Sequence, residues 1–252
     1  MIKKRPIIGF LSMTLASITQ AGTMGPTTTM KTWSNVLTLS AGPIWATGGA
    51  LQSLYFSDEL SRTYTANKKT HALTEGELFI GRQRLLNPRV EGQLGVEVAV
   101  ASKLKLSGDI WEFEDPRFYD YTHSYTLQHH RIALKGKLLV NASNLLKPWI
   151  SASIGIGRNK AASYKETPLI CETEPLPTVL FPTHSTTALT YTLGAGVQRI
   201  VSEHWQIGLG YEFADWGKSR LAGAPAQPSG SNGLALNHLH TNGLLFNITW
   251  LA

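Results

Sequence analysis

The sequence predicts an all-β chain in which eight antiparallel strands form an up-and-down β-barrel with a filled lumen. Two observations carry most of this prediction: apolar and polar residues alternate with a period of two, and short and long connections follow one another in turn. The composition is the third. Only 16% of the 252 residues are charged, whereas glycine occurs 23 times, which suits closely spaced strands better than helices with solvated faces.

Residues 1–21 are expected to be a cleavable signal peptide. A basic stretch over residues 3–5 precedes an apolar run over residues 6–18, and Ala21 is a small residue near the expected cleavage point. The run is too short for a transmembrane helix, which needs about 20 apolar residues. A buried N-terminal helix is the alternative interpretation of this segment.

An N-terminal extension over residues 22–35 and a barrel domain over residues 36–252 are expected to follow. Removing the three basic residues of the signal peptide lowers the formal net charge from +6 to +3, which gives no reason to expect a nucleic-acid partner. Cys171 is the only cysteine, so an intramolecular disulfide is excluded. No later run approaches the roughly 18 apolar residues of a transmembrane helix, so an exported chain is expected to end in a soluble, anchored or barrel form.

Eight segments with period-two alternation follow the extension. They cover residues 36–46, 75–86, 90–111, 125–141, 148–159, 186–201, 205–216 and 239–251. The three short connections lie at residues 87–89, 142–147 and 202–204, and the four long ones at residues 47–74, 112–124, 160–185 and 217–238. An even number of strands, with short turns at one end and long loops at the other, is typical of bacterial membrane barrels.

One face of the predicted strands is apolar and the other is small and polar. The residues expected to face lipid are Leu94, Val96, Val98, Leu189, Tyr191, Leu193, Ile207, Leu209, Tyr211, Phe213, Phe246, Ile248 and Trp250. A soluble β-sandwich, the alternative, would point its large apolar residues inward and would carry more Lys and Glu outside. The pattern therefore favours a transmembrane β-barrel.

The alternation leaves the facing open at two places. In the strand over residues 75–86, two apolar and two basic residues share a face: Leu78, Ile80, Arg82 and Arg84. Three tryptophans have the outward parity near strand ends, as the aromatic girdles of membrane barrels do: Trp45, Trp205 and Trp250. Three others do not: Trp111, Trp149 and Trp216.

The inward face carries charges of both signs. Arg131, Lys135 and Lys137 alternate along one strand, and Glu97 and Glu212 project inward from two others. Buried charges are tolerated only when they are paired and hydrogen-bonded, so we expect an internal salt-bridge network. Eight strands enclose a space that side chains can fill, which predicts a closed lumen. A narrow ion path through the network is the alternative.

Residues 33–252 resemble the superfamily of small outer-membrane barrels that includes OmpA-type and opacity-type surface proteins. The resemblance rests on the strand pattern and on three segments, YTLGAGVQ (191–198), QIGLGYEFADW (206–216) and LHTNGLLFNITWLA (239–252). It implies location in the outer membrane of a Gram-negative cell, with outer-membrane lipid and lipopolysaccharide as surroundings. It also implies that the barrel-assembly machinery recognises the C-terminal strand. The function implied is that of a structural or adhesin-like surface protein without a cofactor.

Catalysis and metal binding are weaker interpretations. A few barrels of this kind modify lipid, and HLHTNG (238–243) loosely resembles a segment of the lipid A deacylases, but no G-x-S-x-G motif is present. We therefore expect no enzymatic activity. His238 and His240 share one strand face, a spacing that two metal ligands can use, but the sequence offers no third ligand, so no metal is expected.

The long connections are the expected working surface, because function in such scaffolds sits on loops held by a rigid frame. The richest covers residues 160–185, with four prolines and three glutamates. Its apolar residues, expected to be exposed for contact with a host or surface ligand, are Leu169, Ile170, Val179, Leu180 and Phe181. A loop that only shields the barrel is the alternative.

Overall fold

The computed structural model describes residues 33–57, 60–142, 146–169, 180–225, 227–228 and 230–252. The expected signal peptide and Cys171 lie outside these residues, as do Ile170 and Val179 of the richest connection. These described residues form one compact unit. Within the described part of the chain, no helix is long and apolar enough to cross a membrane.

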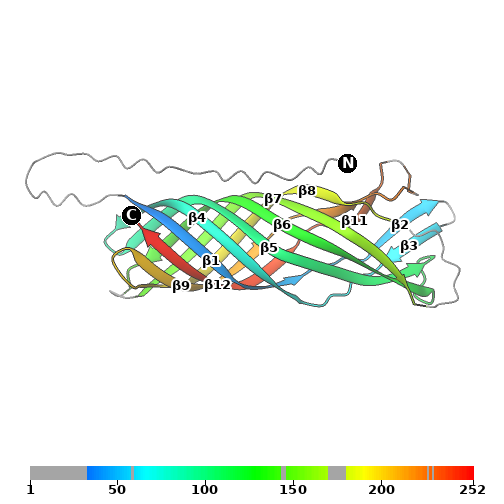
Figure 1. Cartoon of the computed structure of the whole chain (residues 1–252), viewed down its shortest axis with the longest axis horizontal. Coiled ribbons are helices and arrows are strands. Elements are labelled where there is room, and N and C mark those ends of the chain that lie inside the picture. The colour runs from blue at the N-terminus through cyan, green and yellow to red at the C-terminus, as the bar shows by residue number, and fades with distance from the viewer. Residues whose placement is uncertain (1–32, 58–59, 143–145, 170–179, 226, 229) are drawn as a thin grey trace, which may run out of the picture. The chain divides into compact units, whose positions relative to one another are not determined.

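Eight strands form a closed antiparallel ring, and Figure 1 shows this barrel from the side. They are β1 (Ser34–Thr47), β4 (His71–Asn87), β5 (Val90–Glu112), β6 (Tyr119–Val140), β7 (Leu146–Pro168), β8 (His184–Ile200), β9 (Trp205–Asp215) and β12 (His240–Leu251). Each pairs with its neighbours along the chain, and the pairing of β12 with β1 closes the ring. The predicted barrel of eight strands is confirmed.

The two ends of the ring differ in their connections. At one end lie the short turns between β4 and β5, between β6 and β7, and between β8 and β9. The first and last strands meet at this end too, since Asn35 and Ala252 exchange two backbone hydrogen bonds of 3.0 Å. The closing register runs from Val36 opposite Leu251 to Thr47 opposite His240. The long connections therefore all lie at the other end.

The long connections contain more strand than the sequence indicates. β2 (Gln52–Ser57) and β3 (Leu60–Tyr64) form a hairpin that pairs with β5 beyond the ring, and β10 (Ser219–Ala222) pairs with β11 (Asn232–Leu236). β5, β6 and β7 continue as a sheet to lengths of 23, 22 and 23 residues, whereas β9 has 11. The expectation of four long loops is wrong to this extent, because backbone groups in the connections satisfy one another by pairing.

The outer surface of the ring is apolar. Of the thirteen residues expected there, twelve are exposed, and Phe213 is half-buried between Tyr191 and His240. Exposure also settles which face of β4 points outward, since Leu78 and Ile80 are exposed. Four more residues complete the two faces of β4: Arg82 and Arg84 outward, Glu77 and Phe79 inward. Alternation along the strand therefore holds in β4 as well.

Candidate functional site

Six of the buried charged side chains inside the barrel contact one another, and we name them the ionic cluster. They come from β4, β5, β6 and β9, and they are Glu75, Glu77, Glu97, Arg131, Lys135 and Glu212. Strand alternation brings them together, because residues an even number of positions apart share a face and these strands turn that face inward. Four carboxyl groups therefore meet two basic side chains away from solvent.

Arg131 is the centre of the ionic cluster. Its Nε donates to Oε1 of Glu97 and its Nη2 donates to Oε1 of Glu212, each over 2.7 Å. The same Nη2 lies 3.1 Å from Oε1 of Glu75, and the guanidinium carbon lies 4.6 Å from the ring centroid of Trp216. The planar guanidinium thus links β6 to three other strands while it packs on an aromatic face, which a lysine ammonium could not do in the same way.

Lys135 supplies the second positive charge. Its Nζ lies 2.7 Å from Oε1 of Glu77, 2.7 Å from Oε2 of Glu97 and 3.1 Å from Oε2 of Glu212. Both Glu97 and Glu212 are therefore shared between the two bases. Such sharing is what a buried ionic group requires, since an unpaired charge in this environment would be strongly destabilising.

The structure brings together four of the five interior charges that the sequence pattern proposes: Glu97, Arg131, Lys135 and Glu212. Lys137 is buried as well but has other partners. Its Nζ donates to Oε1 of Gln198 over 2.7 Å and lies 4.4 Å from the ring centroid of Trp149. Lys137 therefore stands toward the short-turn side of the ionic cluster rather than within it.

Sequence reasoning missed Glu75 and Glu77, and also the buried pair of Lys147 and Glu91, whose Nζ and Oε1 lie 2.7 Å apart. A signal for the two β4 glutamates was present. Once Leu78 is placed outward, its odd-numbered neighbours must point inward. The arginines on the outward face of β4 concealed that assignment.

The tryptophans divide between the two faces. Trp33, just before β1, is exposed, as are Trp45, Trp205 and Trp250 on the outer surface, whereas Trp149 and Trp216 point into the barrel. Trp111 is half-buried on the extended part of β5, where it pairs with Thr63 of β3. Trp149 fits inside because its indole occupies the space that side chains would take at Gly196 and Gly210, where an added Cβ would lie 2.6 and 2.3 Å from the ring.

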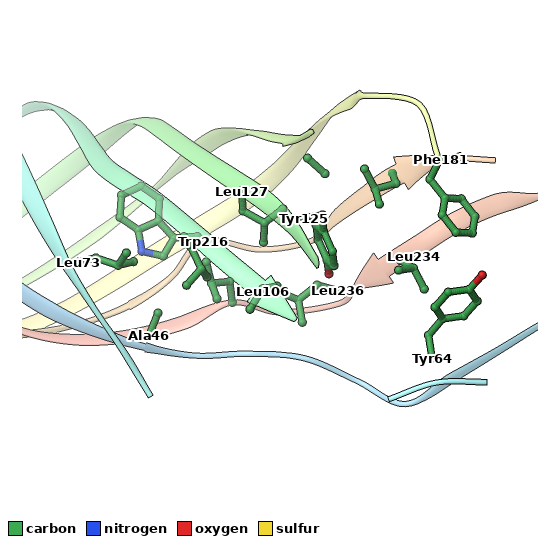
Figure 2. Packing of buried hydrophobic residues seen from close by; sticks show 14 of the residues in the cluster. Ala46, Tyr64, Leu73, Leu106, Tyr125, Leu127, Phe181, Trp216, Leu234 and Leu236 are labelled. Atoms are coloured by element: carbon green, nitrogen blue, oxygen red, sulfur yellow. The ribbon is translucent and has the colours of Figure 1, made fainter. Parts of the chain in front are cut away.

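An apolar core fills the long-connection end, and we name it the cap core. It is formed by the extended ends of the ring strands and by the two hairpins, and Figure 2 shows Leu106, Tyr125, Leu127, Leu234, Leu236, Tyr64 and Phe181 of this cluster. Phe181 is only 4% exposed and packs against Tyr64 with ring centroids 5.7 Å apart. Its predicted exposure is wrong, because Phe181 packs against the rings of Phe56, Tyr64 and Tyr164. Leu169 and Leu180 are exposed as expected.

Polar side chains are buried within the cap as well. Nη2 of Arg62 lies 3.2 Å from Oε1 of Glu112, and its Nη1 lies 3.5 Å from Oε2 of Glu166. His123 stacks beside Tyr125, and burial lowers the pKa of its imidazole to about 4, although the carboxylate of Asp109 opposes this shift. His123 is therefore neutral at pH 7.

The turn between β5 and β6 is the exposed tip of the extended sheet. Phe113 and Phe118 are both exposed, and their rings meet edge to face with centroids 6.1 Å apart. Phe113 and Glu114 have φ angles of 54° and 59°, in the left-handed region that non-glycine residues seldom adopt. Strain of this kind persists where surrounding structure holds it, and it is frequent at binding surfaces.

Strand alternation places neighbouring residues of the segment around the two candidate metal-binding histidines on opposite faces. His238 and His240 point outward, whereas Leu239 and Thr241 are buried. The Thr241 hydroxyl accepts a hydrogen bond of 3.0 Å from the Trp216 indole. Thr241 and His240 therefore lie on opposite faces, and they do not form the nucleophile and base that the deacylase comparison would require. Absence of enzymatic activity remains a prediction.

The sequence matches no family model and no curated protein. Several solved structures are similar. Neisserial surface protein A is 10% identical over 86% of this chain and 96% of its own, with a TM-score of 0.43. Outer membrane protease OmpT from Escherichia coli is 8% identical over 89% and 98%, with a TM-score of 0.46. The attachment invasion locus protein of Yersinia pestis is 10% identical over 88% and 100%, with a TM-score of 0.35. At these values the matches assign no activity, substrate or partner to this chain.

Proposed function

We propose that the chain is an outer-membrane β-barrel surface protein of structural or adhesin-like type, which acts through the extended sheet at its long-connection end. The observation that carries this proposal is a belt of exposed apolar side chains on all eight strands of the ring. A soluble protein of this size does not expose so large an apolar surface. Hydrocarbon is the environment that makes such a belt favourable.

The belt has a defined upper edge. On β5 the outward residues Leu94, Val96, Val98 and Val100 are apolar, and Lys103 and Lys105 follow. On β6 the outward residues between Val140 and Ile132 are apolar except Gly136, and His130 and Gln128 lie beyond. On β7 Ile150, Ile154 and Ile156 precede Arg158 and Lys160. The change from apolar to polar at one level on neighbouring strands is what the edge of a bilayer predicts.

The surroundings follow from this placement. The short-turn end would face the periplasm, and the cap with its hairpins would extend outward among lipopolysaccharide. β12, whose pairing with β1 closes the ring, would be the strand that the barrel-assembly machinery recognises. The expected signal peptide would supply export, and its cleavage stays a prediction.

The interaction role rests on the tip. Phe113 and Phe118 stand at the end of a sheet that continues well past the belt, with Tyr55 and Leu51 exposed on the neighbouring β2 segment. Aromatic side chains are favoured at binding surfaces because they bury much area at little conformational cost. A host or bacterial surface ligand with an apolar region would match this tip.

Membrane fractionation tests the location. We expect the protein in the outer-membrane fraction, with a gel mobility that changes on boiling, because a closed barrel resists detergent until it is heated. Protease added to intact cells should cleave only connections at the long-connection end. Recovery of the full chain in the soluble periplasmic fraction would contradict the membrane location and favour a sandwich.

The same cells test the role of the tip. Adhesion of expressing cells to an epithelial monolayer should exceed that of cells without the protein, and the double substitution Phe113→Ser and Phe118→Ser should remove the excess. Arg117→Gln in the same turn is the matched control, since Arg117 is exposed and contributes charge rather than apolar surface. Equal adhesion of all strains, at equal protein in the outer membrane, would exclude the adhesive role and leave the structural one.

A further inference from the structure

Three potential metal ligands, Asp215, His238 and His240, lie together where β9 ends and β12 begins. Asp215 is the last residue of β9, His240 is the first of β12, and the two are direct partners in the antiparallel register. His238 lies two residues before His240, and the inward anchoring of Leu239, which is fully buried, turns both imidazoles outward. Asp215 is the third potential ligand, which the sequence pattern did not identify.

Two imidazole nitrogens converge on one carboxylate oxygen. Oδ2 of Asp215 lies 2.8 Å from Nδ1 of His238 and 3.5 Å from Nε2 of His240. The three donor atoms all lie within 4.8 Å of one another. Ligands bound to one tetrahedral metal at about 2.0–2.1 Å stand about 3.4 Å apart, so small side-chain movements would complete the coordination.

The carboxylate is held in position by its own surroundings. Oδ1 of Asp215 accepts a hydrogen bond of 2.7 Å from the backbone N–H of Gly217, which leaves Oδ2 for the imidazoles. Gly217 has a φ of +71°, where a side chain would be strained, so this turn depends on glycine. Asp215 is 3% exposed, whereas the side chains of His238 and His240 are 63% and 50% exposed. Orientation of a ligand by a second group is a regular feature of metal sites.

Aromatic contacts orient His240. Its ring lies against Phe213, with centroids 5.5 Å apart, and against His238, with centroids 5.8 Å apart and planes inclined by 26°. Asp215 is buried and held in place, whereas His238 and His240 are largely exposed. The three therefore form an open site rather than a closed structural one. At least one coordination position would remain accessible to solvent.

A second group of potential metal ligands lies inside the barrel, but it has no room for an ion. Glu77, Glu97 and Glu212 also have oxygens within 4.8 Å of one another, but Lys135 and Arg131 already occupy the space between them. No such base stands between Asp215 and the two histidines among the contacts of the described residues. The outward cluster is therefore the one suited to an ion.

We propose that Asp215, His238 and His240 bind a divalent transition metal of the zinc class at the outer rim of the barrel. Two imidazoles and one carboxylate favour Zn²⁺ and similar borderline ions over Ca²⁺ and Mg²⁺, which take oxygen ligands. The bound ion would join the two strand ends from which the β10–β11 hairpin extends. This proposal goes beyond the surface role and does not depend on it.

Calorimetric titration of the untagged, folded full chain in detergent with ZnCl₂ tests the proposal. We expect one Zn²⁺ per chain, and an affinity at least tenfold weaker in His240→Ala and in Asp215→Asn. Asparagine keeps the oxygen that accepts from Gly217, so the turn should survive, and heat-modifiable mobility verifies folding of each variant. Cysteine is itself a zinc ligand, so His240→Cys should restore much of the affinity.

His204→Ala is the matched control, because His204 is an exposed histidine in a short turn at the opposite end of the ring. Its zinc affinity should equal that of the wild type. Absence of stoichiometric binding at millimolar zinc would overturn the proposal, as would equal weakening in His204→Ala. In that case the cluster is an ordinary hydrogen-bonded Asp–His pair, and the fractionation and adhesion results stand unaffected.

Discussion

At the scale of single residues, Arg131 decides whether the interior charges are tolerable. It pairs with four carboxylates and contacts the face of Trp216, and it is 3% exposed. Removing it would leave four glutamates with Lys135 as the remaining basic member of the ionic cluster. Uncompensated buried charge is among the costliest defects that a protein can carry.

We therefore expect Arg131→Met to lower the free energy of unfolding by about 3–5 kcal/mol, the usual cost of breaking a buried ion pair. Denaturant unfolding of the refolded protein, followed by tryptophan fluorescence, measures the change. Arg158→Met is the control, since Arg158 lies outward and exposed on the neighbouring β7, and its effect should stay within about 0.5 kcal/mol. Equal effects of the two substitutions would show that the ionic cluster contributes nothing specific.

At the scale of elements, the extended ends of β5, β6 and β7 depend on the cap core. His123 of β6 is buried there among Tyr64, Tyr125 and Tyr164. Because burial lowers the pKa of His123 to about 4, the folded cap binds a proton less readily than the unfolded segment does. We therefore expect the cap to lose stability at acidic pH.

The direction of the pH dependence follows from this depressed pKa. Stability from neutral His123 is complete above the unfolded value of about 6.5 and is lost as pH falls toward about 4, to a limit of about 3 kcal/mol. Cleavage of the cap by a protease active at both pH 7.5 and pH 5 should accelerate at the lower pH. His123→Phe removes the titration and should flatten that response. An unchanged response in the variant would assign the acid sensitivity to other groups.

At the scale of the whole molecule, ring closure and the filled interior act together. Trp149, the ionic cluster and the cap core occupy successive positions from the short-turn end of the barrel to the long-connection end. Eight strands leave room for side chains but for little else. The geometry therefore favours a closed barrel over the narrow ion channel that the interior charges would otherwise allow.

Single-channel recording in a planar bilayer measures this difference. The wild type should give no steady conductance, whereas joint replacement of the interior tryptophans, Trp149→Ala with Trp216→Ala, should admit small ions by removing two bulky groups from the lumen. A steady wild-type current that changes in Lys135→Ala would contradict the closed barrel and support an ion path through the ionic cluster.

Several features of this protein were determined by its sequence alone. The eight ring strands, their order and the outward faces around Leu94, Leu193 and Ile248 follow from alternation, which is a local property that each segment carries by itself. The inward placement of Arg131 and Lys135 follows from the same rule. The connection lengths also indicate which end would face outward.

Only the tertiary structure decided which side chains meet. Glu212 reaches Arg131 across 81 positions of the chain, and Asp215 stands opposite His240 because of the strand register, which no local pattern encodes. Phe181 is buried because hairpins within the long connections fold over it. Alternation assigns a residue to a face, but its partner depends on register and on ring closure, and these are settled only when all eight strands pair.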